Sequence, residues 1–156
     1  MNKKGLDAQG WRDNKLLIGL LGDKKAHRII AMWAADCAEH VLHLFEEKYP
    51  EDKRPREAIE AGRAWIRGEI RVGEVRKAAI ATHAAARQVN QDDARAAARA
   101  AGHAAGTAHV AGHAIHAAEY ACKAVSFLPQ PESGANPMAS EIEWQLTHLR
   151  KLLEKR

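Results

Sequence analysis

An alanine-rich stretch from Asp93 to Val125 constrains the fold more than any other part of the sequence. Roughly half of its residues are alanine, the residue with the highest intrinsic helix propensity. Asp92 and Asp93 at its start suit the positive end of a helix dipole, and Pro129 follows just beyond its end. The stretch therefore predicts one long central helix, around which the other helices pack.

Glycines and histidines share one face of this predicted helix. At 100° per residue, a stripe about 80° wide holds two glycines, three histidines and a tyrosine: Gly102, Gly106, His109, His113, His116 and Tyr120. A glycine inside a helix costs about 1 kcal/mol relative to alanine, so these glycines and Gly112 need a packing reason. We expect a second helix backbone to approach closely at the glycines, either within the domain or across a homodimer.

The rest of the sequence predicts further helices and no strand. The expected segments are a flexible start over 1–10, helices over 11–21, 23–49, 56–67, 74–89 and 140–155, and a proline-rich loop over 127–139. Asp23 is the expected N-cap of the second helix, and Ser140 with Glu143 forms a capping box for the last. We predict an all-α fold, in which residues 1–156 form one compact bundle of five or six helices around the Ala/Gly/His-rich central helix.

The composition is typical of a soluble globular protein, with 156 residues, of which 46% are hydrophobic and 28% charged. Four of the few aromatic residues are tryptophans that we expect to anchor helix packing: Trp11, Trp33, Trp65 and Trp144. Cys37 and Cys122 have no CxxC partner and lie in alanine-rich segments, so we expect small buried hydrophobes in a reduced, cytoplasmic protein. No apolar run is long enough to cross a membrane.

The histidine stripe suggests a metal site as one alternative. His109 and His113 are spaced so that both imidazoles can reach one ion, whereas His116 lies a further turn away. Asp36, Glu39, His40 and His43 could complete the site if their helix faces the central one. The zincin pattern HExxH is absent. We favour histidines that hydrogen-bond within the bundle and expect no cofactor. The alternative is a divalent metal on His109, His113, Asp36 and Glu39.

Charged residues also occur in helices that otherwise contain few polar groups. Asp36 and Glu39 lie at the edge of an apolar helix face. Four arginines lie in similar surroundings: Arg63, Arg87, Arg95 and Arg99. Paired Asp and Arg side chains inside a bundle usually fix the register of its helices. The alternative is a polar pocket in which Asp36 or Glu39 acts as a base.

Two long segments resemble a known family. The phrases MWAADCAEHVLHLFEEKYPEDKRPREAIEAGRAWIRGEI and AARAAGHAAGTAHVAGHAIHAAEYACKAV are similar to bacterial helical immunity proteins of the immunity-five-like kind, over about residues 29–125. The resemblance implies an all-α fold and the neutralisation of a partner protein, such as a toxin. It brings no agreed catalytic residues. The ATHAAAR segment between the two phrases also matches. Seven positions within these matching segments merit testing: Asp36, Glu39, Arg63, His83, Arg87, His109 and His113.

The sequence thus leaves three functions to compare. The favoured one is a non-catalytic module that neutralises or sequesters a partner protein by occluding it. The second is a metal-dependent or acid–base enzyme, with a site of His and Asp or Glu between the central helices. The third is a nucleic-acid-binding protein, suggested by the net charge of +4 and by basic clusters at residues 24–25, 53–56 and 67–77. Because acidic residues intersperse the basic clusters and no aromatic platform accompanies them, a solvated basic face is the preferred interpretation.

Overall fold

The computed structural model describes residues 15–155. Its helices are α2 (Lys15–Leu21), the short 3-10 helix η2 (Lys24–Ala26), α3 (His27–Glu46), α4 (Arg54–Ile66), α5 (Val72–Arg87), α6 (Asp92–Gly106), α7 (His113–Ser126) and α8 (Pro137–Glu154). No strand occurs within residues 15–155, so the all-α prediction is confirmed. The predictions for residues 1–10 and Trp11 lie outside the described residues.

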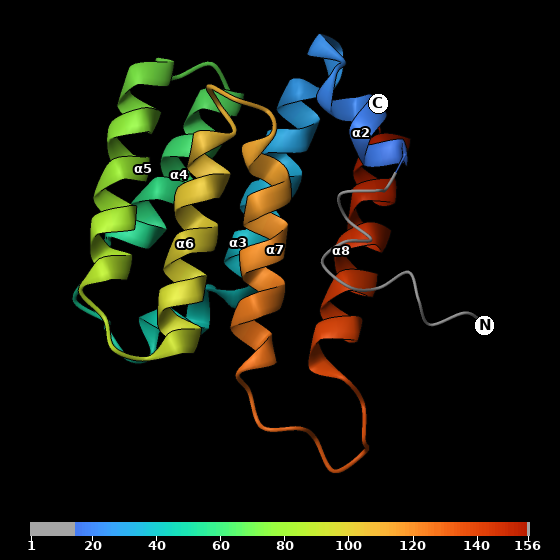
Figure 1. Cartoon of the computed structure of the whole chain (residues 1–156). Helices are drawn as coiled ribbons and strands as arrows, with labels where there is room; N and C mark the ends of the chain where they lie inside the picture. Colours follow the sequence, from blue (N-terminus) through green and yellow to red (C-terminus); the bar gives the residue numbers. More distant parts are fainter. Residues whose placement is uncertain (1–14, 156) are drawn as a thin grey trace.

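Helix α3 lies at the centre of the packing and contacts α4, α6, α7 and α8. In Figure 1, α5, α6 and α7 stand side by side in front of α3 and α4, and α8 stands next to α7 at the right. Large buried side chains of α3, such as Trp33, Leu42 and Phe45, fill the middle of the bundle. Buried alanines of α6 and α7 cover them, because small side chains let neighbouring helices approach closely.

The single long helix predicted from the alanine-rich stretch is wrong: the structure has two helices there. α6 ends at Gly106, α7 begins at His113, and the six residues between them form turns. A continuous helix over this stretch would be about 50 Å long, far longer than the 20-residue helix α3 that it covers. By folding back, the chain packs α6 against α7 and places both alanine-rich faces in the core.

Hydrogen bonds from both sides hold the turn between α6 and α7. The hydroxyl of Thr107 donates to the carbonyl of His103 (3.1 Å), and the backbone N–H of Val110 donates to the carbonyl of Gly106 (3.1 Å). From α3, the ring of His27 donates through Nε2 to the carbonyl of Thr107 (2.6 Å). These bonds satisfy carbonyls that the end of α6 would otherwise leave unpaired.

The helix starts also differ in part from the prediction. Asn136 caps α8, since its side chain accepts from the backbone N–H groups of Met138 (3.0 Å) and Ala139 (3.3 Å). The predicted capping box of Ser140 and Glu143 is therefore wrong. A proline directly after the cap suits the first turn, where its missing N–H is no loss. Asp23 is an N-cap, as expected, but it caps η2 rather than α3.

The tryptophans and cysteines of the described region behave largely as expected. Trp33 is fully buried, whereas Trp65 and Trp144 are partly buried against the core. Cys37 and Cys122 are buried and form no disulfide, and burial raises the pKa of the Cys37 thiol. Among residues 15–155, no helix is both long enough and apolar enough to span a bilayer.

Candidate functional site

A network of carboxylates and guanidinium groups joins α3 to α4. Asp36 and Glu39 lie three residues apart on one shoulder of α3, and Arg63 reaches them from α4, which packs alongside. The guanidinium of Arg63 donates to both oxygens of Glu39 at 3.0 Å, and its Nη2 also donates to Oδ1 of Asp36 at 3.0 Å. One arginine thus binds two carboxylates with the bidentate geometry that strengthens such pairs.

A second arginine extends this network along the two helices. Arg56 donates to Glu39 and also to Glu46, with Nη2 to Oε1 at 2.6 Å. Hydrogen bonds from Arg63 lower the pKa of Glu39 against the opposing effect of burial, and its contact with Arg56 lowers it further. The contacts of Arg63 with Glu39 and Asp36 raise its own pKa. Glu39 is therefore ionised at neutral pH, which makes it a weak proton acceptor.

Two histidine–carboxylate pairs join α3 to α8. The ring of His148 donates through Nε2 to Oδ2 of Asp36 (2.7 Å), and the ring of His40 donates through Nδ1 to Oε2 of Glu141 (2.8 Å). Trp144 lies between the two imidazoles, with ring centroids 3.8 Å from His40 and 5.0 Å from His148. All three rings are nearly parallel, so the indole is held in one orientation.

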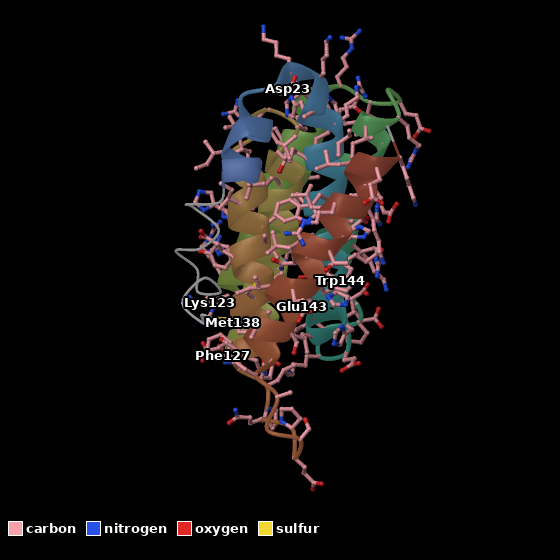
Figure 2. All side chains as sticks on the ribbon, turned by 90° about the vertical axis from the view of Figure 1, so that its right-hand side faces the viewer. Asp23, Lys123, Phe127, Met138, Glu143 and Trp144 are labelled. Atoms are coloured by element: carbon pink, nitrogen blue, oxygen red, sulfur yellow. The ribbon has the colours of Figure 1, made fainter. Side chains whose placement is uncertain are left out.

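This stack lines an open hollow of about 410 Å³ between α3 and α8, which we call the tryptophan face. Asp36, Glu39, His40, Trp144 and His148 line it, and Figure 2 shows Trp144 at the edge of α8. Of these five, the sequence prediction named the two carboxylates as candidate site residues and His40 as a possible metal ligand. The spacing of Glu141, Trp144 and His148 along α8 places them on one helix face, but it does not tell which helix that face meets.

A second polar cluster lies on the hairpin of α6 and α7, and we call it the histidine cluster. It contains His83 from α5, His103 from α6, His109 from the turn, and His113, His116 and Tyr120 from the α7 side. His103 lies at its centre: its ring centroid is 4.9 Å from that of His83, 5.2 Å from those of His113 and His116, and 5.3 Å from that of Tyr120. The sequence prediction did not include His103, because its ring lies outside the stripe on a continuous helix. It meets the rings of α7 only because the chain turns back after α6.

The glycines of α6 make room for imidazole rings. A Cβ atom on Gly102 would lie 2.7 Å from Cε1 and Nε2 of His83, and one on Gly106 would lie 3.1 Å from Cγ of His113. Real Cβ atoms do not approach so closely, so glycine is required at Gly102 while His83 keeps this position. The expectation of a packing reason was therefore right for Gly102 and Gly106, but the group that packs there is a histidine ring and not a second backbone. It was wrong for Gly112, where a Cβ atom would meet only the Val110 side chain at 4.0 Å.

Burial and neighbouring positive charge favour the neutral form of His83, His103 and His113. Desolvation lowers the pKa of His103 to about 3, with further lowering from His83 and His113. Burial likewise lowers the pKa of His83, followed by the effect of Arg99, and burial lowers that of His113. Arg99 donates through Nη1 to Nδ1 of His83 (2.8 Å), and since arginine has no acceptor, that nitrogen carries no proton.

A model of the family described as "Imm-5 like putative immunity protein" matches residues 20–152. The chain belongs to this family. No curated protein and no solved structure gives a match. The family of helical immunity proteins indicated by the sequence is thus the correct one, and its match covers almost every described helix.

For this immunity-family chain, the structure places six of the seven predicted site residues in two groups. Asp36, Glu39 and Arg63 contact one another, whereas His83, His109 and His113 belong to the histidine cluster. Arg87 is exposed in the last turn of α5. The expected meeting of His109 and His113 with Asp36 and Glu39 is not formed. Among residues 15–155, no three His, Cys, Asp or Glu side chains are arranged to hold a metal ion.

Proposed function

We propose that this chain is a non-catalytic module that binds a partner protein and neutralises it, and that the tryptophan face is the surface that makes contact. Membership of the immunity family supports a protein as the partner. The chemistry of the face supports binding over catalysis, because its carboxylates are committed to ion pairs with Arg56 and Arg63. A toxin is the partner class that this family suggests.

The preorganised indole of Trp144 carries this proposal. Tryptophan is among the residues that most often dominate the energy of protein–protein interfaces, especially beside a hollow that a partner side chain can fill. Here two imidazoles fix the indole, and a carboxylate fixes each imidazole. Little side-chain entropy is therefore lost when a partner covers the ring.

The charge of the tryptophan face indicates what kind of partner surface it fits. Carboxylates outnumber guanidinium groups around the face: Asp36, Glu39, Glu46 and Glu60 pair with Arg56 and Arg63, and Glu141 pairs with His40. Complementary potential speeds association and selects partners. We therefore expect basic residues of the partner to surround the group that covers Trp144.

The test uses the full chain as bait in lysate of the host bacterium, followed by co-expression with each captured protein. Under this proposal one captured protein arrests growth, and co-expression of the wild-type chain relieves the arrest. Trp144→Ala should weaken binding of that protein at least tenfold, as expected for an interface anchor. The matched control is Ile80→Ala, which removes an apolar side chain that is 62% exposed on α5 and should bind normally. If no captured protein arrests growth, the proposed function is wrong.

Acid–base catalysis remains a second candidate because of the His148–Asp36 pair at the open hollow. His148→Gln distinguishes the two functions. A general acid or base contributes about 10²- to 10⁴-fold to a rate, so an enzyme would lose nearly all of its protection against the partner. A binding module would keep protection when the chain is in excess, because Trp144 still offers its ring.

A further inference from the structure

A basic hollow of about 200 Å³ lies between α6 and α7, apart from the tryptophan face. Arg95 and Arg99, one turn apart on α6, line one wall, and Tyr120, Lys123 and Phe127 of the α7 side line the other. Figure 2 shows Lys123 and Phe127 together near the end of α7, toward the edge of the view opposite Trp144. Three cationic side chains from two rigid helices therefore surround one small space.

The cations of this hollow keep hydrogen-bond donors for a further acceptor. Arg99 gives one N–H to His83, and Arg95 gives one to Asp92 (3.2 Å) and one to the carbonyl of Val89 (2.8 Å). A guanidinium has five N–H groups, so both arginines retain several. The exposed ammonium of Lys123 lies 5.8 Å from the centroid of the Tyr120 ring and is free to turn toward the hollow.

The surroundings leave the positive charge of the hollow largely unneutralised. Asp92 is the one acidic side chain among the residues that line it, and it already pairs with Arg95. Beyond Tyr120 the hollow borders the histidine cluster, whose central ring, His103, stacks on that tyrosine. The charge of Arg99 helps burial to lower the pKa of the neighbouring His83.

We propose that this hollow binds a phosphate group, either as inorganic phosphate or as the phosphate of a nucleoside monophosphate. Phosphate carries close to two negative charges and three acceptor oxygens, which match three converging cations better than a single carboxylate does. Arginine pairs bind such oxygens in a bidentate manner. The ring of Phe127, 45% exposed at the rim, offers a face for a planar base. This site goes beyond the proposed function and does not depend on it.

Isothermal titration of the full chain with four probes tests the site: inorganic phosphate, AMP, adenosine and a hexaglutamate peptide. Phosphate and AMP should bind, and adenosine and the peptide should bind far more weakly. The variant Arg95→Gln with Lys123→Gln should weaken the binding of phosphate and AMP about tenfold or more, because it removes two of the three charges. Lys123→Gln alone serves as a second variant, because a substitution at this exposed position should not disturb folding.

The matched control is Arg76→Gln with Lys77→Gln, which removes two exposed cations of α5 outside the hollow. This variant should change phosphate affinity less than about twofold, because charges beyond a Debye length of about 10 Å are screened. Tighter binding of AMP than of phosphate would identify a nucleotide as the source of the group, and equal binding would identify free phosphate.

Four results would overturn the proposal. Neither phosphate nor AMP binds; adenosine binds as tightly as AMP; the peptide binds and phosphate does not; or both double variants lose affinity equally. The third would assign the hollow to an acidic segment of a protein, and the fourth would show that only the net charge of the chain matters. None of these results concerns capture of a partner through Trp144, so the proposed function would stand or fall separately.

Discussion

Two regions of the molecule use histidine in opposite ways. In the tryptophan face, His40 and His148 each contact a carboxylate, and Asp36, the partner of His148, in turn contacts Arg63. In the histidine cluster, His103 contacts His83 and His113, and His83 also contacts Arg99. The first region brings opposite charges together, whereas the second gathers groups that repel one another once they are protonated.

The difference shows what stabilises each region. In the network of α3, α4 and α8, ionised carboxylates and guanidinium groups attract one another, so the network requires charge. The histidine cluster depends on rings that fit against Gly102 and Gly106, so it requires neutral imidazoles. The two regions therefore respond to different substitutions and to different ranges of pH.

Removal of Arg63 should have the largest effect on stability. In Arg63→Met, Asp36 and Glu39 lose their shared partner while remaining partly buried, with side chains 25% and 39% exposed. An orphaned buried charge costs about 3–5 kcal/mol. Partial exposure reduces this, as do the remaining contacts of Asp36 with His148 and of Glu39 with Arg56, so we expect a loss of about 2 kcal/mol in the free energy of unfolding. Urea denaturation at neutral pH measures it.

The matched control for this substitution is Arg67→Met, one turn further along α4. Arg67 pairs with Glu69 through two bonds of 2.9 Å, yet both side chains are more than half exposed. Exposed ion pairs add little to stability, so Arg67→Met should have the same urea midpoint as the wild type. Equal urea midpoints for the two variants would show that the network is no more than a set of surface ion pairs.

The fold class could be predicted from the sequence because helical periodicity is local, and most helix positions follow from it. The hairpin of α6 and α7 could not be predicted in this way. Alanine favours helix on both sides of residues 107–112, and the bond from His27 that anchors the turn spans 80 residues. The pairing of Arg63 with Asp36 was foreseeable as a type of contact, since an arginine in an apolar helix needs an acidic partner.

The contribution of α8 to the site was beyond such reasoning. His148 meets Asp36 across 112 residues, and Glu141 meets His40 across 101. Nothing in the local pattern of α8 tells which helix it will face. For the same reason His103 was missed, since it joins His113 only after the turn brings α7 back along α6.

Lowering the pH should also distinguish the stability of the two regions. A histidine whose pKa is lowered by folding contributes its full stabilisation at pH values above its pKa in the unfolded state. This contribution is lost as the pH falls from the unfolded-state pKa toward the folded-state pKa. Carboxylates with a lowered pKa, such as Glu39, lose their contribution to stability only at pH values below their own pKa in the unfolded state. Between pH 6.5 and pH 4.5, the ordinary values of His and Glu, the loss of stability should therefore come from the histidine cluster.

Urea midpoints across this range in two variants test the assignment. His103→Gln should flatten the decline between pH 6.5 and 4.5, whereas Arg63→Met should leave that decline unchanged and lose stability already at neutral pH. His43→Gln, at an exposed histidine of α3, is the control and should behave as the wild type. A wild-type midpoint that stays constant over this range would contradict the buried, neutral state of the cluster.

The smallest effect concerns the fit of His83 against α6. Gly102→Ala gains about 1 kcal/mol of helix propensity, but its Cβ meets the His83 ring at 2.7 Å and forces it from Arg99. Overpacking costs about 1–3 kcal/mol, so we expect a net loss of about 1 kcal/mol in urea denaturation. Gly73→Ala has open space on α5 and should instead gain about 0.5 kcal/mol. In a His83→Ala background the sign at Gly102 should reverse, and a loss that persists there would show that the glycine serves something other than the histidine ring.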